Sequence, residues 1–318
     1  MALLDVTDLT VAFAHAAVVR GISFHIDPGE TLALVGESGC GKSMTAFALL
    51  QLLPRQARIS GGQIRFAGQD LVGASPRALR DIRGRRIGLI LQEPMTSLNP
   101  VLPVGAQVAE MIRCHESISR AAARKRVIEL FDLVGIPDPA KRCDAYPHTF
   151  SGGMRQRVMI AMAIACGPDL LVADEPTTAL DVTIQAQVLD LLADLRRQMG
   201  MAMLLITHDL GVVAQWADRV AVMYAGRIVE QAPVGAFLEA PLHPYAQGLM
   251  QSDIDHDEAW HYSTHRLQEI PGSVASARGE SGCAFAPRCD RTMPLCRTAP
   301  PPLHPSGEGR SVACVAVP

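Results

Sequence analysis

The segment GESGCGKS, residues 36–43, has the spacing of a phosphate-binding loop: a glycine, four residues, then Gly-Lys-Ser. The apolar run TLALV precedes it, and MTAFALLQLL, apolar at helical spacing, follows it, so the loop joins a predicted strand to a predicted helix. Glycines let backbone N–H groups surround a phosphate at the positive end of that helix. A chance glycine-rich turn is the alternative, which the flanking elements disfavour. We expect a nucleotide phosphate to contact Gly36, Glu37, Ser38, Gly39, Cys40, Gly41, Lys42, Ser43 and Met44, with the Ser43 hydroxyl on Mg²⁺.

Two acids, Asp174 and Glu175, end the apolar segment LLVADEP. After a phosphate-binding loop, one carboxylate at such a strand end holds the Mg²⁺ shell, and another residue orients or deprotonates the attacking water. We assign Asp174 to magnesium and Glu175 to the water. Taken alone, the pair would fit solvated acids at the start of a loop equally well; the loop at 36–43 favours the catalytic interpretation.

A third feature is Ser151-Gly152-Gly153, directly before a predicted helix. Ser151 can cap that helix, and the glycines let an anion approach its exposed N–H groups. One nucleotide needs only one loop, so a second phosphate site would serve ATP held by another subunit. An ordinary capped helix is the alternative, and physical chemistry alone favours it.

These residues require a scaffold of strands and helices. Residues 1 to 30 predict short strands around the turn DPGE, residues 104 to 166 predict helices with Ser119 capping the second, and strands then alternate with helices. The predicted fold class is α/β: a P-loop NTPase core with a parallel sheet, a small antiparallel β subdomain, a helical insert (about 95–165) and an irregular cysteine-containing C-terminal tail. Beyond about residue 240 the periodicity stops, so apolar burial alone is expected to hold the tail poorly.

Composition limits the classes of partner. The 318 residues are 48% hydrophobic with a formal charge of −3, which provides no basic field for nucleic acid. The first residues, MALLDVTDLTVAF, lack the basic start of a secretory signal, and no window reaches the roughly 18 uninterrupted apolar residues of a membrane span. We therefore expect a cytosolic chain whose membrane role is peripheral. Because cytosolic thiols stay reduced, the eight cysteines are expected to be metal ligands or core residues.

The segment FSGGMRQR, residues 150–157, resembles the signature motif of ABC transporter ATPases, usually written with Leu in place of Phe150. The family's other motifs stand in order: GESGCGKS resembles Walker A, LILQEP the Q-loop, LLVADE Walker B, TALD (178–181) the D-loop and ITHD the switch region. The resemblance implies catalytic roles for Glu175, His208 and Gln92, an aromatic contact of Phe13 with adenine, Mg²⁺ at Ser43, Gln92 and Asp174, a D-loop Asp181, and contacts to a second subunit's ATP from Ser151, Gly152, Gly153 and Gln156.

Longer segments narrow the resemblance. QEPMTSLNPVLPVG, VMYAGRIVE, HPYAQGLM and EIPGSV resemble ATP-binding subunits of dipeptide and oligopeptide permeases, particularly the first of the two that such systems encode. The departures are Phe150, Glu93 where Asp is common, and the stretch 251–265. The resemblance implies an ABC ATP-binding domain over 1–240 and an oligopeptide-transporter-type C-terminal region over 241–318.

The resemblance also implies partners and a location. It implies two membrane permease subunits and, indirectly, an extracytoplasmic solute-binding protein, with the chain at the cytoplasmic face of the inner membrane. It also implies a second ATP-binding subunit that meets this one head to tail; a different chain is favoured over another copy of this one, and both stay open. The transported solute could be a peptide, nickel or a sugar, and the resemblance favours them in that order. A soluble ABC ATPase usually carries a second cassette or a long coiled-coil insert, and a P-loop kinase or GTPase would not explain the SGG segment or His208.

The last question is the tail's four cysteines: Cys283, Cys289, Cys296 and Cys314. Four thiolates suit zinc or an iron–sulfur cluster, and the absence of a Cys-x-x-Cys pair argues against zinc. Some members of the resembled family hold a [4Fe–4S] cluster there, so we hypothesise one here that holds the tail together. Cys40, Cys114, Cys143 and Cys166 are expected to be ordinary loop or core thiols.

Overall fold

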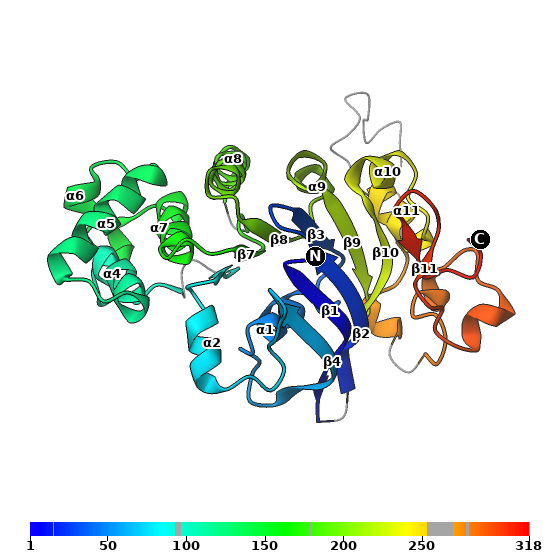
Figure 1. The fold of residues 1–318 in the computed structure, drawn as a ribbon. Helices are drawn as coiled ribbons and strands as arrows, with labels where there is room; N and C mark the ends of the chain where they lie inside the picture. The colour runs from blue at the N-terminus through cyan, green and yellow to red at the C-terminus, as the bar shows by residue number, and fades with distance from the viewer. Residues whose placement is uncertain (15, 93–96, 179, 253–269, 278–279, 318) are drawn as a thin grey trace. The chain divides into compact units, whose positions relative to one another are not determined.

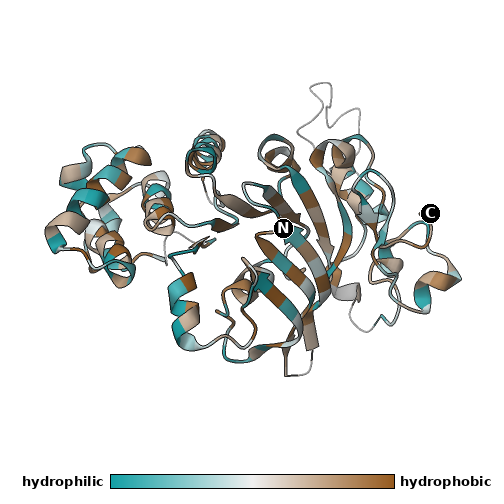
Figure 2. Ribbon diagram, in the orientation of Figure 1, coloured by the Kyte–Doolittle hydropathy of each residue, from teal (hydrophilic) through white to brown (hydrophobic). Residues whose placement is uncertain are grey.

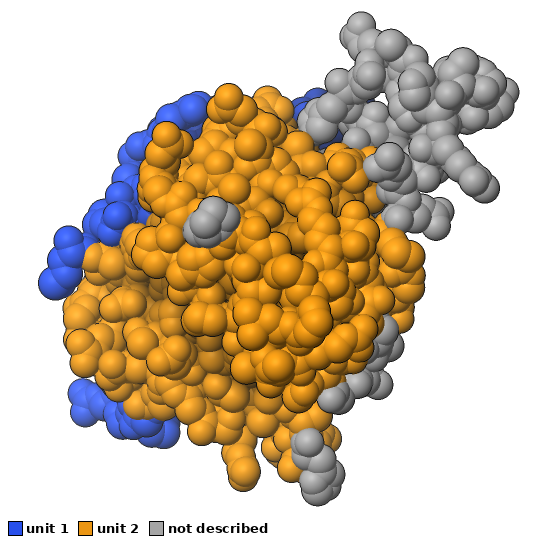
Figure 3. Space-filling view, turned by 90° about the vertical axis from the view of Figure 1, so that its right-hand side faces the viewer, with its two compact units in different colours: residues 1, 27–30, 73–205 blue, residues 2–26, 31–72, 206–318 orange. Residues whose placement is uncertain are grey.

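The computed structural model describes the whole chain except residues 15, 93–96, 179, 253–269, 278–279 and 318. Glu93 and most of the 251–265 stretch therefore lie outside the described residues. The chain forms two compact units, each assembled from separated stretches (Figure 3): unit 1 holds residues 1, 27–30 and 73–205, and unit 2 holds 2–26, 31–72 and 206–318.

Unit 2 contains the predicted small antiparallel β subdomain, a sheet of strand order β2-β1-β4-β5 (Figure 1). Side chains in β1 alternate between buried and exposed, as period-2 patterning requires when one face is packed. Val6 pairs with Phe24 on one side and with Ile64 on the other, both antiparallel. The strands are β1 (Leu4–Phe13), β2 (Ala16–Ile26), β4 (Ala57–Phe66) and β5 (Gln69–Asp70).

Unit 2 also contributes strands of a second sheet in the order β11-β12-β10-β9-β3. All five residues of β3 are buried, and β3 runs parallel to β9, as expected for a strand covered on both faces. The predicted hairpin turns at Gly226 (φ 86°), where a Cβ would lie 2.6 Å from the Val18 carbonyl oxygen. The strands are β3 (Thr31–Val35), β9 (Arg219–Tyr224), β10 (Arg227–Pro233), β11 (His304–Pro305) and β12 (Ser311–Val312), and the helices are α1 (Lys42–Leu49), α9 (Leu210–Trp216), α10 (Val234–Glu239) and α11 (Pro244–Ser252), with 3₁₀ turns η3 (Val274–Ala277), η4 (Ala286–Arg288) and η5 (Pro294–Arg297).

Unit 1 holds strands in the order β8-β7-β6 and the helices of the insert. The predicted cap is confirmed: the Ser119 hydroxyl accepts a hydrogen bond from the Ala122 N–H at 3.2 Å. The strands are β6 (Ile87–Ile90), β7 (Leu170–Asp174) and β8 (Ala202–Thr207, whose last two residues count in unit 2), and the helices are α2 (Pro76–Ile82), α4 (Val104–His115), α5 (Arg120–Leu133), α6 (Pro139–Arg142), α7 (Gly152–Ile164) and α8 (Val182–Met199), with a 3₁₀ turn η1 (Pro147–Thr149). The α/β class is confirmed.

Hydropathy follows the burial of these elements. The strands of the larger sheet are coloured mostly as apolar, while the helices of the insert alternate between apolar and polar positions (Figure 2). None of the helices in the described part of the chain combines the length and the apolar character needed to cross a bilayer.

The tail corrects one expectation. Apolar burial was predicted to hold it poorly, yet Phe285 packs on Tyr224 and Tyr245, with ring centroids 5.2 Å and 5.4 Å apart. These rings belong to one buried cluster that also includes Phe237 of α10 and residues of β3 and β9. Aromatic residues bury large apolar areas, so a few of them hold a segment that lacks any regular period. The described tail is therefore part of a hydrophobic core.

A buried histidine in the tail should make unfolding pH-dependent. His243 is 1% exposed, its Nδ1 accepts the Tyr245 N–H at 3.0 Å, and burial lowers its pKa to about 4. Since the unfolded value is about 6.5, the unfolded chain binds more protons between these values, and stability is lost as pH falls from about 6.5 towards 4. The His243 contribution at pH 5 should be about 2 kcal/mol lower than at pH 8.

Chemical denaturation at pH 8 and pH 5 measures this loss. The Asn side chain in His243→Asn can still accept the Tyr245 N–H, but it does not titrate. Between pH 8 and pH 5 the variant should therefore lose about 2 kcal/mol less unfolding free energy than the wild type does. The difference between the two proteins is the readout, because burial raises the pKa of neighbouring Glu230 and contributes a slope of opposite sign. Equal slopes for the two proteins would contradict the prediction.

Candidate functional site

The loop of residues 36–41 joins β3 to α1 within unit 2, and two of its glycines are sterically required. A Cβ at Gly36 (φ 151°) would lie 2.1 Å from the Met223 carbonyl oxygen. At Gly41 (φ 113°) it would lie 2.8 Å from the Val18 carbonyl oxygen. Both residues have positive φ, which glycine adopts at little cost. The loop is thus packed closely against the backbone of neighbouring strands.

Lys42 begins α1, and its ammonium group reaches back across the loop. Its Nζ donates to the Gly36 carbonyl at 2.6 Å and to the Glu37 carbonyl at 3.2 Å. The first turn of α1 contains no acidic residue, so no side chain there offsets the positive end of the helix dipole. A lysine charge and free helix N–H groups at one loop suit a phosphate.

Unit 1 brings together two residues predicted from separate motifs. Gln92 Nε2 donates to Glu175 Oε2 at 2.8 Å, although 83 residues separate them. Glu175 follows β7 with φ 46°, a left-handed conformation that costs a non-glycine residue about 1–3 kcal/mol. Asp174, the last residue of β7, is buried. This strand end therefore holds one carboxylate inside the fold and the next in a strained, hydrogen-bonded position.

Thr178, the first residue of the predicted D-loop segment, makes a contact that was not predicted: its Oγ1 donates to Glu175 Oε2 at 2.9 Å. The sequence signal for this contact was that Thr178 follows Glu175 by only three residues, within hydrogen-bonding reach on the same loop. Two donors, from Gln92 and Thr178, thus converge on one oxygen of the Glu175 carboxylate. Two donors on one oxygen fix the orientation of the Glu175 carboxylate.

The signature segment begins α7 as expected for a capped helix. The Ser151 hydroxyl accepts the Met154 N–H at 3.3 Å, and Ser151 and Gly152 are exposed. A Cβ at Gly153 would lie 2.7 Å from Ile184 Cγ2. Phe150 is buried, so the substitution for Leu keeps an apolar residue in the packing. The exposed start of α7 is open to an anion.

Gln156 and Asp181 both have structural surroundings that were not predicted from the sequence. Gln156 is 0% exposed, so in this structure its amide is inaccessible to a nucleotide. Helical periodicity explains this, because Gln156 shares a buried face of α7 with Met159 and Ile160, three and four residues further on. Asp181 caps α8, its Oδ1 accepting the Ile184 N–H at 3.0 Å. A D-loop role for Asp181 would come in addition to this capping role.

Two further predicted residues lie in unit 2. His208 is exposed directly after β8, and the next residue, Asp209, caps α9 by accepting the Val212 N–H at 3.0 Å. Phe13 is half-buried at the end of β1, paired with Ala16 and Ala57.

The tail thiols are all free, Cys283 and Cys289 half-buried, Cys296 and Cys314 buried. Burial raises the pKa of the Cys283 thiol, and the nearby Cys296 and Cys314 raise it further. Burial also raises the pKa of the Cys289 thiol, and Cys314 adds to that shift. No group of three or more His, Cys, Asp or Glu side chains in the described part of the chain is arranged to hold a metal ion. The four-ligand hypothesis therefore finds no support in this arrangement.

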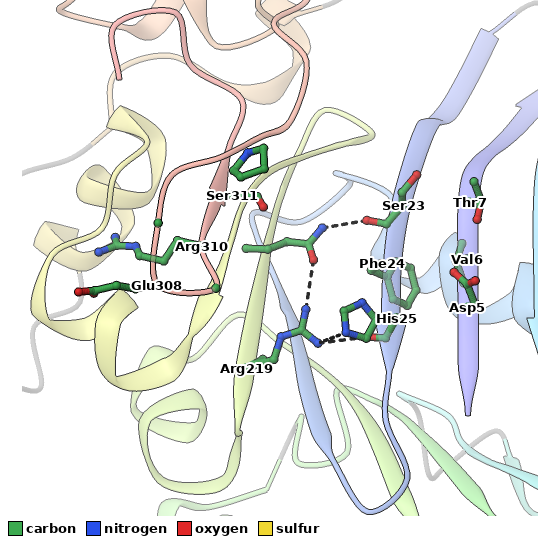
Figure 4. A pocket seen from close by; sticks show the side chains of 14 residues that line it. Asp5, Val6, Thr7, Ser23, Phe24, His25, Arg219, Glu308, Arg310 and Ser311 are labelled. Atoms are coloured by element: carbon green, nitrogen blue, oxygen red, sulfur yellow. Dashed lines mark hydrogen bonds between the residues drawn. The ribbon is translucent and has the colours of Figure 1, made fainter. Parts of the chain in front are cut away.

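A separate cavity of about 500 Å³ in unit 2 is lined by none of the predicted site residues (Figure 4). Its central polar groups bond one another: Arg219 Nη1 lies 3.2 Å from His25 Nε2, and Gln231 Nε2 donates to the Ser23 carbonyl at 2.8 Å. This cavity lies between β2 and the loop carrying Arg310, and we assign it no ligand.

Comparison with known proteins identifies the family. A family model described as ABC transporter matches residues 19–178, which include the loop at 36–43, Gln92, the signature segment and Glu175. This chain belongs to the ABC transporter family. A second model, described as oligopeptide/dipeptide transporter, C-terminal region, matches residues 229–296 of this ABC protein.

Relatives match nearly the whole ABC chain. It is 52% identical over 318 residues to a probable peptide ABC transporter ATP-binding protein, y4tR, of Sinorhizobium fredii, covering 98% of this chain and 94% of the relative. It is 49% identical over 307 residues to the oligopeptide transport ATP-binding protein OppD of Bacillus subtilis, covering 95% and 85%. Membership of the peptide-transporter branch of the ABC ATPases, with ATP and Mg²⁺ as the family's cofactors, is therefore confirmed.

Solved structures share the fold. CbiO1 of Clostridium perfringens, part of the ABC transporter complex cbiONQ, has a TM-score of 0.66 at 26% identity and covers 75% of this chain and 91% of CbiO1. A dimeric, post-hydrolysis structure of the ATP-binding cassette MJ0796 with ADP and Pi has a TM-score of 0.65 at 24% identity, covering 73% and 98%.

Proposed function

We propose that this chain is the ATP-hydrolysing subunit of an ABC importer for dipeptides or oligopeptides. The observation that carries the proposal is the near-full-length similarity to peptide-transporter ATP-binding proteins, together with two family models that match successive parts of the chain. We further propose that residues 1–240 bind ATP and that residues 241–318 are the oligopeptide-transporter-type region.

In this proposal Lys42 and the loop N–H groups bind the ATP phosphates, and Phe13 contacts the adenine. Ser43, Asp174 and Gln92 supply hydroxyl, carboxylate and amide oxygens, the hard ligands that Mg²⁺ prefers, and the bound ion would neutralise charge on the phosphates. His208 contacts the terminal phosphate. The exposure of His208 and the burial of Asp174 at a strand end are compatible with these roles.

Glu175 takes the proton from the attacking water. Its hydrogen bonds from Gln92 and Thr178 fix the orientation of the carboxylate, and a general base must be held within reach of the proton it takes. The strained backbone at Glu175 fits a position where geometry matters more than local stability.

The exposed start of α7 supports a head-to-tail assembly with a second ATP-binding subunit. Ser151, Gly152 and Gly153 bind the phosphates of ATP held by a second, different ATP-binding subunit, and that subunit's signature segment binds the ATP of this chain. The family resemblance assigns Gln156, buried in this chain, to the same contact. Closure of the pair moves two membrane permease subunits at the cytoplasmic face of the inner membrane, and an extracytoplasmic solute-binding protein delivers the peptide.

Reconstitution tests this function. The chain, its two permease subunits and the second ATPase are placed in proteoliposomes, and ATP hydrolysis is measured with solute-binding protein that is empty or loaded with peptide. Peptide-loaded binding protein should raise ATPase activity and drive peptide uptake. Recovery of the chain only as a lone ATPase would contradict the transporter role, and uptake of nickel or a sugar instead of peptide would contradict the cargo.

The [4Fe–4S] hypothesis for Cys283, Cys289, Cys296 and Cys314 stays a prediction with its own test. Anaerobically purified protein should contain about four irons and four sulfides per chain and absorb visible light by charge transfer. Protein without iron would show that the tail packs through its aromatic cluster alone.

A further inference from the structure

Residue Glu37 of the phosphate-binding loop is held by three groups, two of which come from the C-terminal region. Its carbonyl oxygen accepts from Lys42 Nζ at 3.2 Å. Its backbone N–H donates to the Tyr245 hydroxyl at 2.9 Å, and its carboxylate accepts from Arg288 Nη1 at 3.0 Å. Since its N–H and its carboxylate both bond to protein groups, Glu37 links the phosphate-binding loop to the C-terminal region.

Arg288 is built into the fold and does not reach out from the surface. Its side chain is 4% exposed, against 27% for Glu37. Nε donates to the Pro271 carbonyl at 2.7 Å, Nη2 to the Ile270 carbonyl at 3.1 Å, and the guanidinium lies over the rings of Tyr224 and Phe285 at 5.7 Å and 6.0 Å. A fork with this many fixed partners has little freedom to move, so it defines where the Glu37 carboxylate lies.

Tyr245 is equally fixed. It is fully buried in α11, tilted against Tyr224 with ring centroids 4.6 Å apart. Its hydroxyl satisfies the Glu37 N–H, and an unsatisfied buried N–H costs about 1–3 kcal/mol.

Arg288 and Tyr245 belong to a different part of the chain from the loop that they contact. The ABC transporter model matches residues 19–178, whereas Tyr245 and Arg288 lie within 229–296, the match to the oligopeptide/dipeptide transporter region. The second region therefore contacts the nucleotide loop of the first directly. A displacement of Glu37 would also move the carbonyl that accepts from Lys42 Nζ, so the contact reaches the group proposed to bind the phosphates.

We propose that Arg288 and Tyr245 are positioning residues: the C-terminal region holds the phosphate-binding loop in its ATP-binding conformation through Glu37. This inference rests on the proposed function and adds to it a role for the C-terminal region in nucleotide affinity. Because the two residues act through Glu37 and do not reach the reacting atoms, their loss should weaken ATP binding more than it slows the chemical step.

A double-mutant cycle on the full chain tests the proposal, with Kd for ATP measured by calorimetry and KM and kcat by phosphate release. Arg288→Gln and Glu37→Gln should each raise Kd and KM about tenfold, with a smaller effect on kcat. The double variant should be no weaker than either single variant, because the first substitution already breaks the pair. Arg288→Lys should restore part of the affinity, since it keeps the charge but not the fork.

Two further variants complete the design. Tyr245→Phe keeps the buried ring and removes only the acceptor for the Glu37 N–H, so it should raise Kd several-fold, and it tests the proposal even if Arg288→Gln does not fold. Arg297→Gln removes an exposed arginine of the same tail and should leave Kd unchanged.

The possible outcomes separate failure of the positioning proposal from failure of the proposed ATPase function. The proposal would be overturned if Arg288→Gln and Tyr245→Phe both left the Kd for ATP unchanged. It would also be overturned if the fold-changes in Kd of Arg288→Gln and Glu37→Gln multiplied in the double variant. Neither result would contradict the ATPase function. Loss of thermal stability without a change in Kd would likewise overturn the proposal. Wild-type protein that binds no ATP would instead contradict the proposed function.

Discussion

Replacing Glu175 with Gln should slow ATP hydrolysis about 100- to 10,000-fold, or about 3 to 5 kcal/mol of activation free energy, while ATP still binds. The amide keeps the shape of the side chain but cannot take a proton from water. ATP binding survives because Glu175 contacts Gln92 and Thr178, and the phosphates are assigned to Lys42 and the loop at 36–43. Single-turnover phosphate release and equilibrium ATP binding measure the two effects separately.

Two matched variants control this experiment. Thr178→Val removes one donor to Glu175 Oε2 at nearly constant volume, so it should reduce hydrolysis by a smaller factor than Glu175→Gln. Glu129→Gln makes the same chemical change at an exposed acid of α5 and should leave hydrolysis unchanged. Near-normal turnover in Glu175→Gln would show that another group deprotonates the water.

Lys42→Ala should abolish measurable ATP binding. The substitution removes the one side-chain cation assigned to the phosphates, and with it the two hydrogen bonds that cross the loop to Gly36 and Glu37. A charge-assisted contact to phosphate in a partly dehydrated site is among the strongest single contacts available to a protein. Calorimetry with Mg²⁺ and ATP measures the loss.

The control is Lys125→Ala, which removes an exposed lysine of α5 that forms only a 3.8 Å pair with Glu129. Its ATP affinity should equal that of wild type. Circular dichroism of Lys42→Ala should show an unchanged fold, so that loss of binding is not mistaken for unfolding. Wild-type affinity in Lys42→Ala would contradict the assignment of Lys42 to the phosphates.

Several residues were predictable from sequence because their geometry is local. The spacing of Gly36, Gly41 and Lys42 specifies a loop between a strand and a helix, and the structure has that loop with positive φ at both glycines. Ser119 and Ser151 were predicted as caps from the residues that immediately follow them, and both accept the expected N–H. Interactions over three or four residues are visible in a sequence.

Other contacts were not predictable, because the residues involved are distant and follow no period. Arg288 and Glu37 are 251 positions apart, and Tyr245 and Glu37 are 208 apart. Phe285 stands in a segment without regular spacing, and the short helix α11 that carries Tyr245 was not predicted, so the tail's share of the core was missed. The burial of Gln156 was also missed, because a family resemblance assigns a role to a residue without saying which face of its helix is buried.

The assembly of unit 2 from early and late stretches has a consequence during synthesis. The loop that ends β3 emerges early, but its strand pairs with β9, and Glu37 gains Arg288 only after 251 further residues. At about 5–20 residues per second, roughly 10 to 50 seconds separate the two. During this interval the nascent chain has a nucleotide loop without its Arg288 contact and a β3 strand without its β9 partner. We therefore expect folding to depend on chaperones and to be sensitive to C-terminal truncation.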